Sequence, residues 1–220
     1  KKLSLELGGK NPTIIFGDAD FDKTVQTAVR SAFSNQGEIC LCGSRILVVR
    51  PLYEKFKNAF VEEVKKLKTG DPLVDENWLG AIASKQHFEK ILSYIELAKS
   101  EGGKILCGGH AVQPEGRCAA GYFIAPTVIE GLSFDCRTNQ EEIFGPVTAF
   151  IRASSFEDAI DIANGVEYGL SSAIYTRDVN LAFTAMRDLY TGITYINAGT
   201  IGAEIQLPFG GTRNTGNGHR

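Results

Sequence analysis

The chain has 220 residues, of which 43% are hydrophobic and 22% are charged, a balance typical of an ordinary soluble globular protein. The net charge of −3 argues against nucleic acid and anionic membranes as partners, because both favour a protein with a basic face. The sequence also has no apolar run of about 18 residues, the length that a membrane-spanning helix needs.

The five cysteines are a poor disulfide framework, because their number is odd and their spacing irregular. Cys40 and Cys42 are two positions apart, which is not the Cys-x-x-Cys spacing of zinc and redox sites, and the three histidines are not clustered. We therefore expect no metal site, and a reducing compartment, namely the cytoplasm. The opening stretch 1–7 is too short and too polar for a signal peptide.

In chain order, short β-type runs alternate with longer helical stretches. The first run, 13–16, is apolar, and Asp20 then stands where a helix N-cap would, before residues with an apolar stripe. Similar patterns predict strands over 46–49, 104–107, 147–151, 172–175 and 193–196, an extended segment over 122–129, and helices over 20–34, 51–67, 84–99, 156–163 and 181–189. Segments 108–121 and 208–220 are rich in glycine and polar residues and are predicted to be irregular.

Strands separated by helices imply βαβ units, so the predicted fold class is α/β, with a mainly parallel sheet and flanking helices. The composition shifts nowhere enough to mark a domain boundary within 1–220. The sequence contains no Gly-x-Gly-x-x-Gly, no phosphate-binding P-loop and no Gly-x-Ser-x-Gly motif. If a nucleotide cofactor is used, most of its site must lie outside this chain or be built in another way.

Cys40 lies in the segment NQGEICLCGSR (35–45), between a predicted helix and a predicted strand. A cysteine on a loop between two rigid elements suits a nucleophile, because the thiolate can reach a substrate while its backbone is held. The alternative is that Cys40 is one more small buried hydrophobic residue. Arg45 either lowers the pKa of the thiol or anchors the strand.

Two acidic segments could also carry chemistry. In LELGGKNP (5–12), Glu6 stands among apolar neighbours, where a raised pKa would suit a general base; the alternative is a surface glutamate beside a tight turn. In EEIFGPV (141–147), Glu142 could accept hydrogen bonds from a sugar diol, or the acids could form a solvated rim.

Phe209 in PFGG (208–211) could form the apolar wall of a pocket mouth or belong to a plain turn. His87 and Lys90 share a helix with one charged side and are expected to be exposed to solvent. His110 and His219 are predicted to be loop residues without a chemical role.

Taken together, the segments around Glu6, Cys40, Glu142 and Phe209 resemble the aldehyde dehydrogenase superfamily in their order and approximate spacing, and the similarity extends over essentially all 220 residues. The resemblance implies that 1–220 is the cysteine-bearing α/β catalytic domain of that family. It also implies that an N-terminal cofactor-binding domain and the C-terminal end are absent from this chain, and that the parent protein is a homodimer or homotetramer.

The resemblance implies the following catalytic roles. Cys40 matches the nucleophile, which attacks an aldehyde to give a thiohemiacetal and, after hydride transfer to the nicotinamide, a thioester. The oxyanion would be held by the Cys40 backbone N–H and by an asparagine that belongs upstream of Lys1. Glu6 matches the residue that activates water to hydrolyse the thioester, and it could also help to deprotonate Cys40.

Four further residues match positions that hold the cofactor in the family. Glu142 matches the residue that holds the nicotinamide ribose, and Phe144 the one that packs near the nicotinamide. Leu7 would offer its backbone carbonyl to the carboxamide, and Lys90 would reach the adenosine side.

The function implied is oxidation of an aldehyde to a carboxylic acid with NAD or NADP, of which NAD is favoured. The stretch 37–42 resembles the branch that acts on muconic semialdehydes, but 197–211 is longer than that branch's usual loop, which leaves the aldehyde open. A relative that passes the acyl group to coenzyme A is one alternative, and the presence of Glu6 argues against it. Another is an isolated catalytic-domain fragment that acts as an inactive structural or assembly module, with an exposed interdomain surface that favours self-association.

Overall fold

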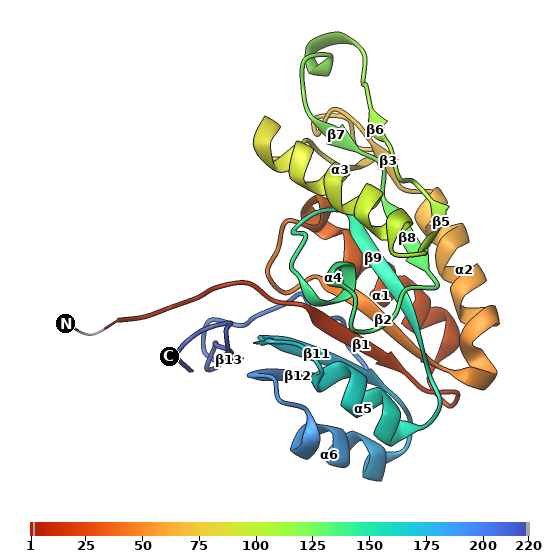
Figure 1. The fold of residues 1–220 in the computed structure, drawn as a ribbon, viewed down its shortest axis with the longest axis vertical. Coiled ribbons are helices and arrows are strands. Elements are labelled where there is room, and N and C mark those ends of the chain that lie inside the picture. Colours follow the sequence, from red (N-terminus) through yellow and green to blue (C-terminus); the bar gives the residue numbers. More distant parts are fainter. Residues whose placement is uncertain (2, 219–220) are drawn as a thin grey trace.

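The computed structural model describes residue 1 and residues 3–218, so His219 lies outside the described residues. At its centre is a seven-stranded sheet in the order β12-β11-β1-β2-β9-β8-β5 (Figure 1). The neighbouring strands from β12 through β8 pair in parallel, and β5 pairs with β8 antiparallel. The prediction of an α/β fold with a mainly parallel sheet and flanking helices is confirmed.

The strands of this sheet are β1 (Asn11–Ile15), β2 (Gly43–Val49), β5 (Lys104–Cys107), β8 (Thr127–Glu130), β9 (Val147–Ala153), β11 (Ser171–Tyr175) and β12 (Ile193–Ile196). The α-helices are α1 (Phe21–Phe33), α2 (Tyr53–Lys65), α3 (Lys85–Ser100), α4 (Arg137–Gln140), α5 (Phe156–Asn164) and α6 (Val179–Asp188). Short 3-10 helices are η1 (Ser34–Gly37), η2 (Arg50–Leu52) and η3 (Gly116–Cys118).

Four of the longer helices begin at a residue whose side chain accepts a hydrogen bond from an otherwise unpaired backbone N–H. Asp20 does so for α1, as predicted, Ser84 for α3, Ser155 for α5 and Asp178 for α6. These caps explain why the predicted helix starts lie close to the observed ones.

The alternating side chains of the central strands supply two cores, one on each face of the sheet. On one face, Ile15 and Ile46 pack with the apolar sides of α1 and α2. On the other, Ile14 and Leu47 pack with α5 and α6, which lie together beneath the sheet in Figure 1. A third cluster lies between α3 and the β8–β9 end of the sheet. Because both faces are covered, the apolar runs Ile14–Ile15 of β1 and Ile46–Val48 of β2 are continuous rather than alternating, as is usual for parallel sheets.

Three pairs of short strands depart from the predicted pattern or were not predicted. The segment 108–121, predicted to be irregular, contains β6 (Ala111–Val112), which pairs with β7 (Phe123–Ile124). The segment 208–220, also predicted to be irregular, contains β13 (Thr212–Arg213), which pairs with β10 (Tyr168–Gly169). A further pair, β3 (Lys68–Thr69) and β4 (Asn77–Leu79), was not predicted. Strands of two or three residues are too short to show a periodicity of two in the sequence.

The topology brings the segments that carry the predicted site to one edge. Since β1, β2 and β9 run in parallel, the segments before their first residues, Asn11, Gly43 and Val147, meet at the amino edge of the sheet. Those are the segments that contain Gly9, Cys40 and Glu142.

Candidate active site

Cys40 lies in a turn between η1 and β2. The turn is closed by a hydrogen bond from the Cys42 N–H to the Ile39 carbonyl oxygen at 2.9 Å. Just before it, Asn35 and Gln36 have φ angles of 49° and 45°, in the left-handed region that side chains disfavour. Cys40 is half-buried, whereas Cys42 is buried with 7% of its surface exposed. The accessible thiol of the pair is thus the one predicted to be the nucleophile.

Opposing influences act on the Cys40 thiol. Burial raises its pKa, and the charges of Glu142 and Glu6 raise the pKa further. The backbone N–H groups of Cys40 and Leu41 interact with the sulfur and lower the pKa. The thiol at position 42 is less reactive, because burial raises its pKa to about 12.

The two glycines before β1 allow the chain to pass closely beside the cysteine loop and Glu142. A Cβ on Gly9 would lie 2.8 Å from the Cys40 carbonyl oxygen, and a Cβ on Gly8 would overlap the Glu142 carboxylate. The Gly9 N–H donates to Glu142 Oε1 at 2.9 Å. The Gly-Gly pair is therefore required here by close approach.

Two hydrogen bonds from side chains of α3 hold the segment around Glu142 and Phe144. Phe144 has a φ of 59°, and its carbonyl oxygen accepts a hydrogen bond from His87 Nε2 at 2.5 Å. Lys90 Nζ donates to the Glu142 carbonyl oxygen at 3.0 Å. Burial raises the pKa of Glu142, an effect that the Gly9 N–H, Lys90 and other neighbouring cations oppose. Lys90 therefore contacts the backbone of Glu142, the residue that is predicted to bind the ribose.

His87 corrects a prediction, since it is half-buried rather than exposed. Its Nε2 lies 3.5 Å from Glu38 Oε1, and its ring lies 5.8 Å from the ring of Phe144. His87 therefore links the cysteine loop to the Phe144 segment. The sequence did not predict this link, because charged residues on the same helix suggested an exposed face. The available indication was the spacing of His87 and Lys90, since residues three apart lie on the same face of a helix.

Glu6 is exposed and is positioned by the far end of the chain. It forms an antiparallel bridge with Gly216, and the Leu7 N–H donates to the Thr215 carbonyl oxygen at 2.7 Å. Thr215 Oγ1 in turn donates to the Gly8 carbonyl oxygen at 2.7 Å. No local pattern in the sequence indicates this pairing, because the partners are more than two hundred positions apart. It places Glu6 close enough to Cys40 for its charge to affect the thiol.

Arg45 anchors the structure, which decides between the two predicted alternatives. It is wholly buried, and it donates to the carbonyl oxygens of Lys10, Ile162 and Ala163 at 2.8–2.9 Å. It thus ties the start of β1 to the end of α5. The Lys10 side chain is also buried, and burial together with Arg45 lowers its pKa to about 7.

Two hollows lie near the thiol. Cys40, Glu142 and Phe144 line a cavity of about 20 Å³, the size of a single water molecule. A larger, mostly apolar groove of about 580 Å³ is lined by Tyr195 and Phe209. The charge of Cys40 raises the pKa of Tyr195, after the larger effect of burial, so the groove lies within electrostatic reach of the thiol. The prediction that Phe209 walls a pocket agrees with this groove.

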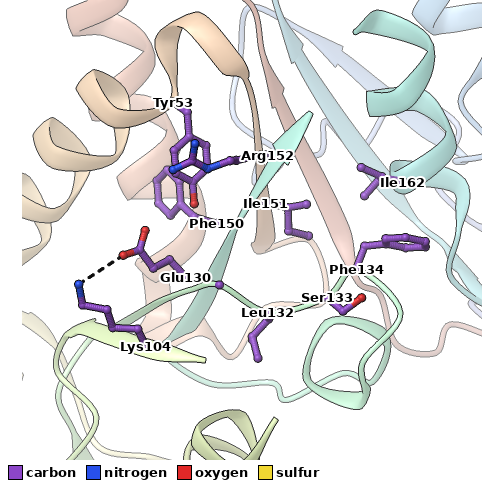
Figure 2. Close-up of a pocket in the computed structure, with 11 residues that line it drawn as sticks. Tyr53, Lys104, Glu130, Leu132, Ser133, Phe134, Phe150, Ile151, Arg152 and Ile162 are labelled. Atoms are coloured by element: carbon purple, nitrogen blue, oxygen red, sulfur yellow. Dashed lines mark ion pairs between the residues drawn. The ribbon is translucent and has the colours of Figure 1, made fainter. Parts of the chain in front are cut away.

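Another cavity, of about 560 Å³, lies at the opposite, carboxyl edge of β8 and β9 (Figure 2). Its charged side chains are paired, Lys104 with Glu130 at 3.7 Å and Arg152 with Glu54. None of the predicted site residues lines it. The chemistry is therefore concentrated at the amino edge.

The residues at the amino edge fit the nicotinamide riboside half of a dinucleotide. The carboxylate of Glu142 is a suitable acceptor for the two hydroxyls of a ribose, and the half-exposed ring of Phe144 offers an apolar surface beside it. Within residues 1 and 3–218, no group of three or more His, Cys, Asp or Glu side chains could hold a metal ion, and no helix is long and apolar enough to cross a membrane.

The molecule is an α/β protein with a mainly parallel sheet, and a half-buried thiol and two carboxylates lie at the amino edge of that sheet. Comparison with known proteins identifies the class more closely: the chain belongs to the aldehyde dehydrogenase family, whose model matches residues 1–220. The resemblance seen in the sequence is thereby confirmed.

Similar proteins include 2-aminomuconic semialdehyde dehydrogenase of Mus musculus, 46% identical over 220 residues, which cover 99% of this chain and 45% of the relative. The alpha-ketoglutaric semialdehyde dehydrogenase of Bacillus subtilis is 38% identical over 96% of this chain and 43% of the relative. A solved structure of betaine aldehyde dehydrogenase from Staphylococcus aureus in complex with NAD+ covers all of this chain, with a TM-score of 0.94 and 37% identity. The chain spans less than half the length of these relatives.

Proposed function

We propose that this chain is the catalytic part of an NAD(P)-dependent aldehyde dehydrogenase, with Cys40 as nucleophile and Glu6 as the group that activates water. The observation that carries the proposal is the convergence of Cys40, Glu142 and Glu6 at one edge of the sheet, where both carboxylates affect the thiol. Family membership and relatives named as aldehyde dehydrogenases support it.

In the proposed reaction, the thiolate of Cys40 attacks the carbonyl carbon of an aldehyde. A C–S bond forms, and the carbonyl π electrons move to oxygen, where the Cys40 backbone N–H can stabilise the negative charge. A bound NAD(P) supplies a hydride acceptor, for which Glu142 and Phe144 are the proposed binding residues. Leu7 and Lys90 complete the proposed cofactor-binding set of this chain.

Glu6 acts on the thioester carried by Cys40. Its carboxylate takes a proton from water as the water oxygen attacks the acyl carbon. The C–S bond then breaks to release a carboxylic acid, and the proton held by Glu6 passes to the departing Cys40 thiolate. The charge of Glu6 raises the pKa of Cys40, so the structure offers no support for the idea that Glu6 assists thiol ionisation electrostatically. Because Glu6 is exposed, water has access to it.

A phenyl ester tests this chemistry without the cofactor, since an activated ester acylates a thiol directly and yields the same kind of thioester. We expect p-nitrophenyl acetate to acylate Cys40 first among the five cysteines, as seen by mass spectrometry of peptides. Cys40→Ser should abolish p-nitrophenolate release, and Glu6→Gln should retain one rapid turnover but accumulate acylated Cys40. Cys42→Ser is the matched control and should retain turnover.

Acylation of another cysteine, or turnover that survives Cys40→Ser, would contradict the proposed nucleophile. No acylation at all in a folded chain would favour the alternative, an inactive structural or assembly module. Deacylation that is unchanged in Glu6→Gln would remove Glu6 from the mechanism.

The wider setting of the protein is part of the same proposal. All five cysteines are free, which supports a reducing compartment such as the cytoplasm. We propose that the parent protein is a homodimer or homotetramer that acts on a small aldehyde. NAD is favoured over NADP as cofactor, and the related structure that contains NAD+ supports a nicotinamide nucleotide.

A further inference from the structure

Asn11, the first residue of β1, has its side chain in the interior of the site. Only 2% of its surface is exposed. Its Nδ2 donates to the Cys40 carbonyl oxygen at 2.7 Å and to the Cys42 carbonyl oxygen at 2.9 Å, while its Oδ1 accepts from the Ser171 N–H at 3.1 Å. One amide thus joins the first residue of β1 to the cysteine loop before β2 and to the start of β11.

These partners fix the orientation of the amide. Two carbonyl oxygens can face only its NH₂ group, and the Ser171 N–H can face only its oxygen. The close approach is made possible by Gly9, at which a Cβ would lie 2.8 Å from the Cys40 carbonyl oxygen and 2.9 Å from Asn11 Oδ1. The register of β1 on β2 also shifts between Asn11 and Pro12, which places Asn11 opposite Gly43 at the base of the loop.

The bond to the Cys40 carbonyl affects the peptide group that follows the cysteine. In a trans peptide, the C=O of one residue and the N–H of the next point in opposite directions, and the unit is rigid. Holding the Cys40 carbonyl toward Asn11 therefore directs the Leu41 N–H away from Asn11. That N–H is one of the two backbone groups that interact with the Cys40 sulfur.

We propose that Asn11 is a positioning residue for the nucleophile: it holds the Cys40–Leu41 peptide group so that the Leu41 N–H faces the sulfur. This inference rests on the proposed role of Cys40. The N–H partly offsets the effect of the surrounding carboxylates, since a hydrogen bond to the charged form of a thiol favours thiolate. Without Asn11, the same burial and the same charges would leave Cys40 with less thiolate at neutral pH.

The titratable groups that face the thiol come from four segments. Glu6 and Glu142 are the carboxylates whose charges act on it, from before β1 and before β9. Cys42 and Tyr195 are the further groups on which the charge of Cys40 acts, from its own loop and from β12. Substituting Asn11 changes none of these charges, so a change in the titration of Cys40 reports on the backbone donors.

The test is the pH dependence of Cys40 alkylation by iodoacetamide in the whole 220-residue chain, followed by mass spectrometry of peptides. Asn11→Leu keeps the approximate size of the side chain but removes all three hydrogen bonds. We expect its profile to move to higher pH by about one unit, with a roughly tenfold slower reaction near pH 7. Asn11→Ser, which can make one of the two donations, is a second variant for the case that leucine prevents folding, and it should move the profile in the same direction.

Asn164→Leu is the matched control, because Asn164 also bridges backbone groups, the Asp188 carbonyl and the Tyr190 N–H, but at the end of α5. It should lower the melting temperature and leave the Cys40 profile unchanged. Profiles of the Asn11 variants that coincide with the wild type, or that move no further than the control, would overturn the inference. Failure of the proposed function is distinguishable, since Cys40 would then not be the first cysteine acylated in the wild type.

Discussion

At the scale of single residues, the Cys40 thiol is held in an environment that does not favour ionisation. Burial and two carboxylates raise its pKa, and the backbone N–H groups of Cys40 and Leu41 oppose them. This differs from the electropositive surroundings of many reactive cysteines. Arg45, the cation that the sequence places nearest, is turned toward carbonyl groups instead. The thiolate fraction in this chain therefore depends on the carboxylates' protonation and on the orientation of backbone N–H groups.

Replacing Glu142 by Gln tests the electrostatic part of this view. Removal of the negative charge favours the thiolate, so the pKa of Cys40 should fall and its alkylation profile should move to lower pH. The rate at neutral pH should rise roughly threefold to tenfold, as expected for a shift of half a pKa unit to one unit. The measurement is the rate of iodoacetamide labelling of Cys40 from pH 6 to 10.

Glu141→Gln is the control for that change. Glu141 neighbours Glu142 in the chain, but its carboxylate pairs with Arg137 at 2.6 Å and accepts a hydrogen bond from Tyr94, and it is not among the main groups that shift the pKa of Cys40. An equal shift in both variants, or a shift to higher pH in Glu142→Gln, would show that the carboxylate at 142 does not act on the thiol by its charge.

At the scale of elements, the sheet and α5 are joined by a buried cation. The last carbonyl groups of an α-helix have no partner within the helix, and Arg45 on β2 donates to those of Ile162 and Ala163. Its third bond, to Lys10, holds the segment that leads from Gly9 into β1. The same side chain thus stabilises the fold and the amino edge that forms the site.

Arg45→Met should destabilise the chain by about 3 to 5 kcal/mol, because it removes three hydrogen bonds to buried carbonyl groups, of which that of Ile162 keeps the Gly165 N–H as a donor. The midpoint of urea unfolding, followed by circular dichroism, measures the effect. Arg187→Met is the control, since Arg187 is exposed and pairs with the neighbouring Asp188, a kind of contact that contributes about 0–1 kcal/mol. A midpoint for Arg45→Met as high as that of the control would refute the anchoring role.

Most of the long elements follow the predicted ranges. The strand over 193–196 and the helix over 156–163 coincide with β12 and α5 to within one residue, because apolar periodicity and capping residues mark them. The pairs β3–β4, β6–β7 and β10–β13 and the short helix α4 have no such marks. They form only because the surrounding chain brings their partners together.

At the scale of the whole molecule, one sheet connects the cores on its two faces. Phe150 on β9 lies at the centre of the larger core, with its ring 5.1 Å from that of Phe60, 6.1 Å from that of Tyr53 and 6.4 Å from that of Phe56. It is 1% exposed. Since the strands of that core also supply the opposite one, we expect the chain to unfold as one unit.

Phe150→Ala tests this expectation. It should cost about 3 to 5 kcal/mol by leaving a cavity among the aromatic rings. Trp78, the single tryptophan, lies on β4 outside that core, so its fluorescence reports on unfolding away from the substituted position. The urea transitions seen by tryptophan fluorescence and by circular dichroism should move together to lower concentration. Transitions that separate in the variant would show that the β3–β4 region unfolds independently.

The α/β fold, the family and the residues that match the family's site could be predicted from the sequence, because these depend on local periodicity and on short ordered motifs. Which groups each side chain contacts became clear only from the folded arrangement of the whole chain. It placed Arg45 against carbonyl groups, brought Thr215 and Gly216 to the Glu6 segment, and set Asn11 beneath the cysteine loop. The physical reason is that these hydrogen-bond partners are distant in the chain, so their pairing leaves no local pattern to detect.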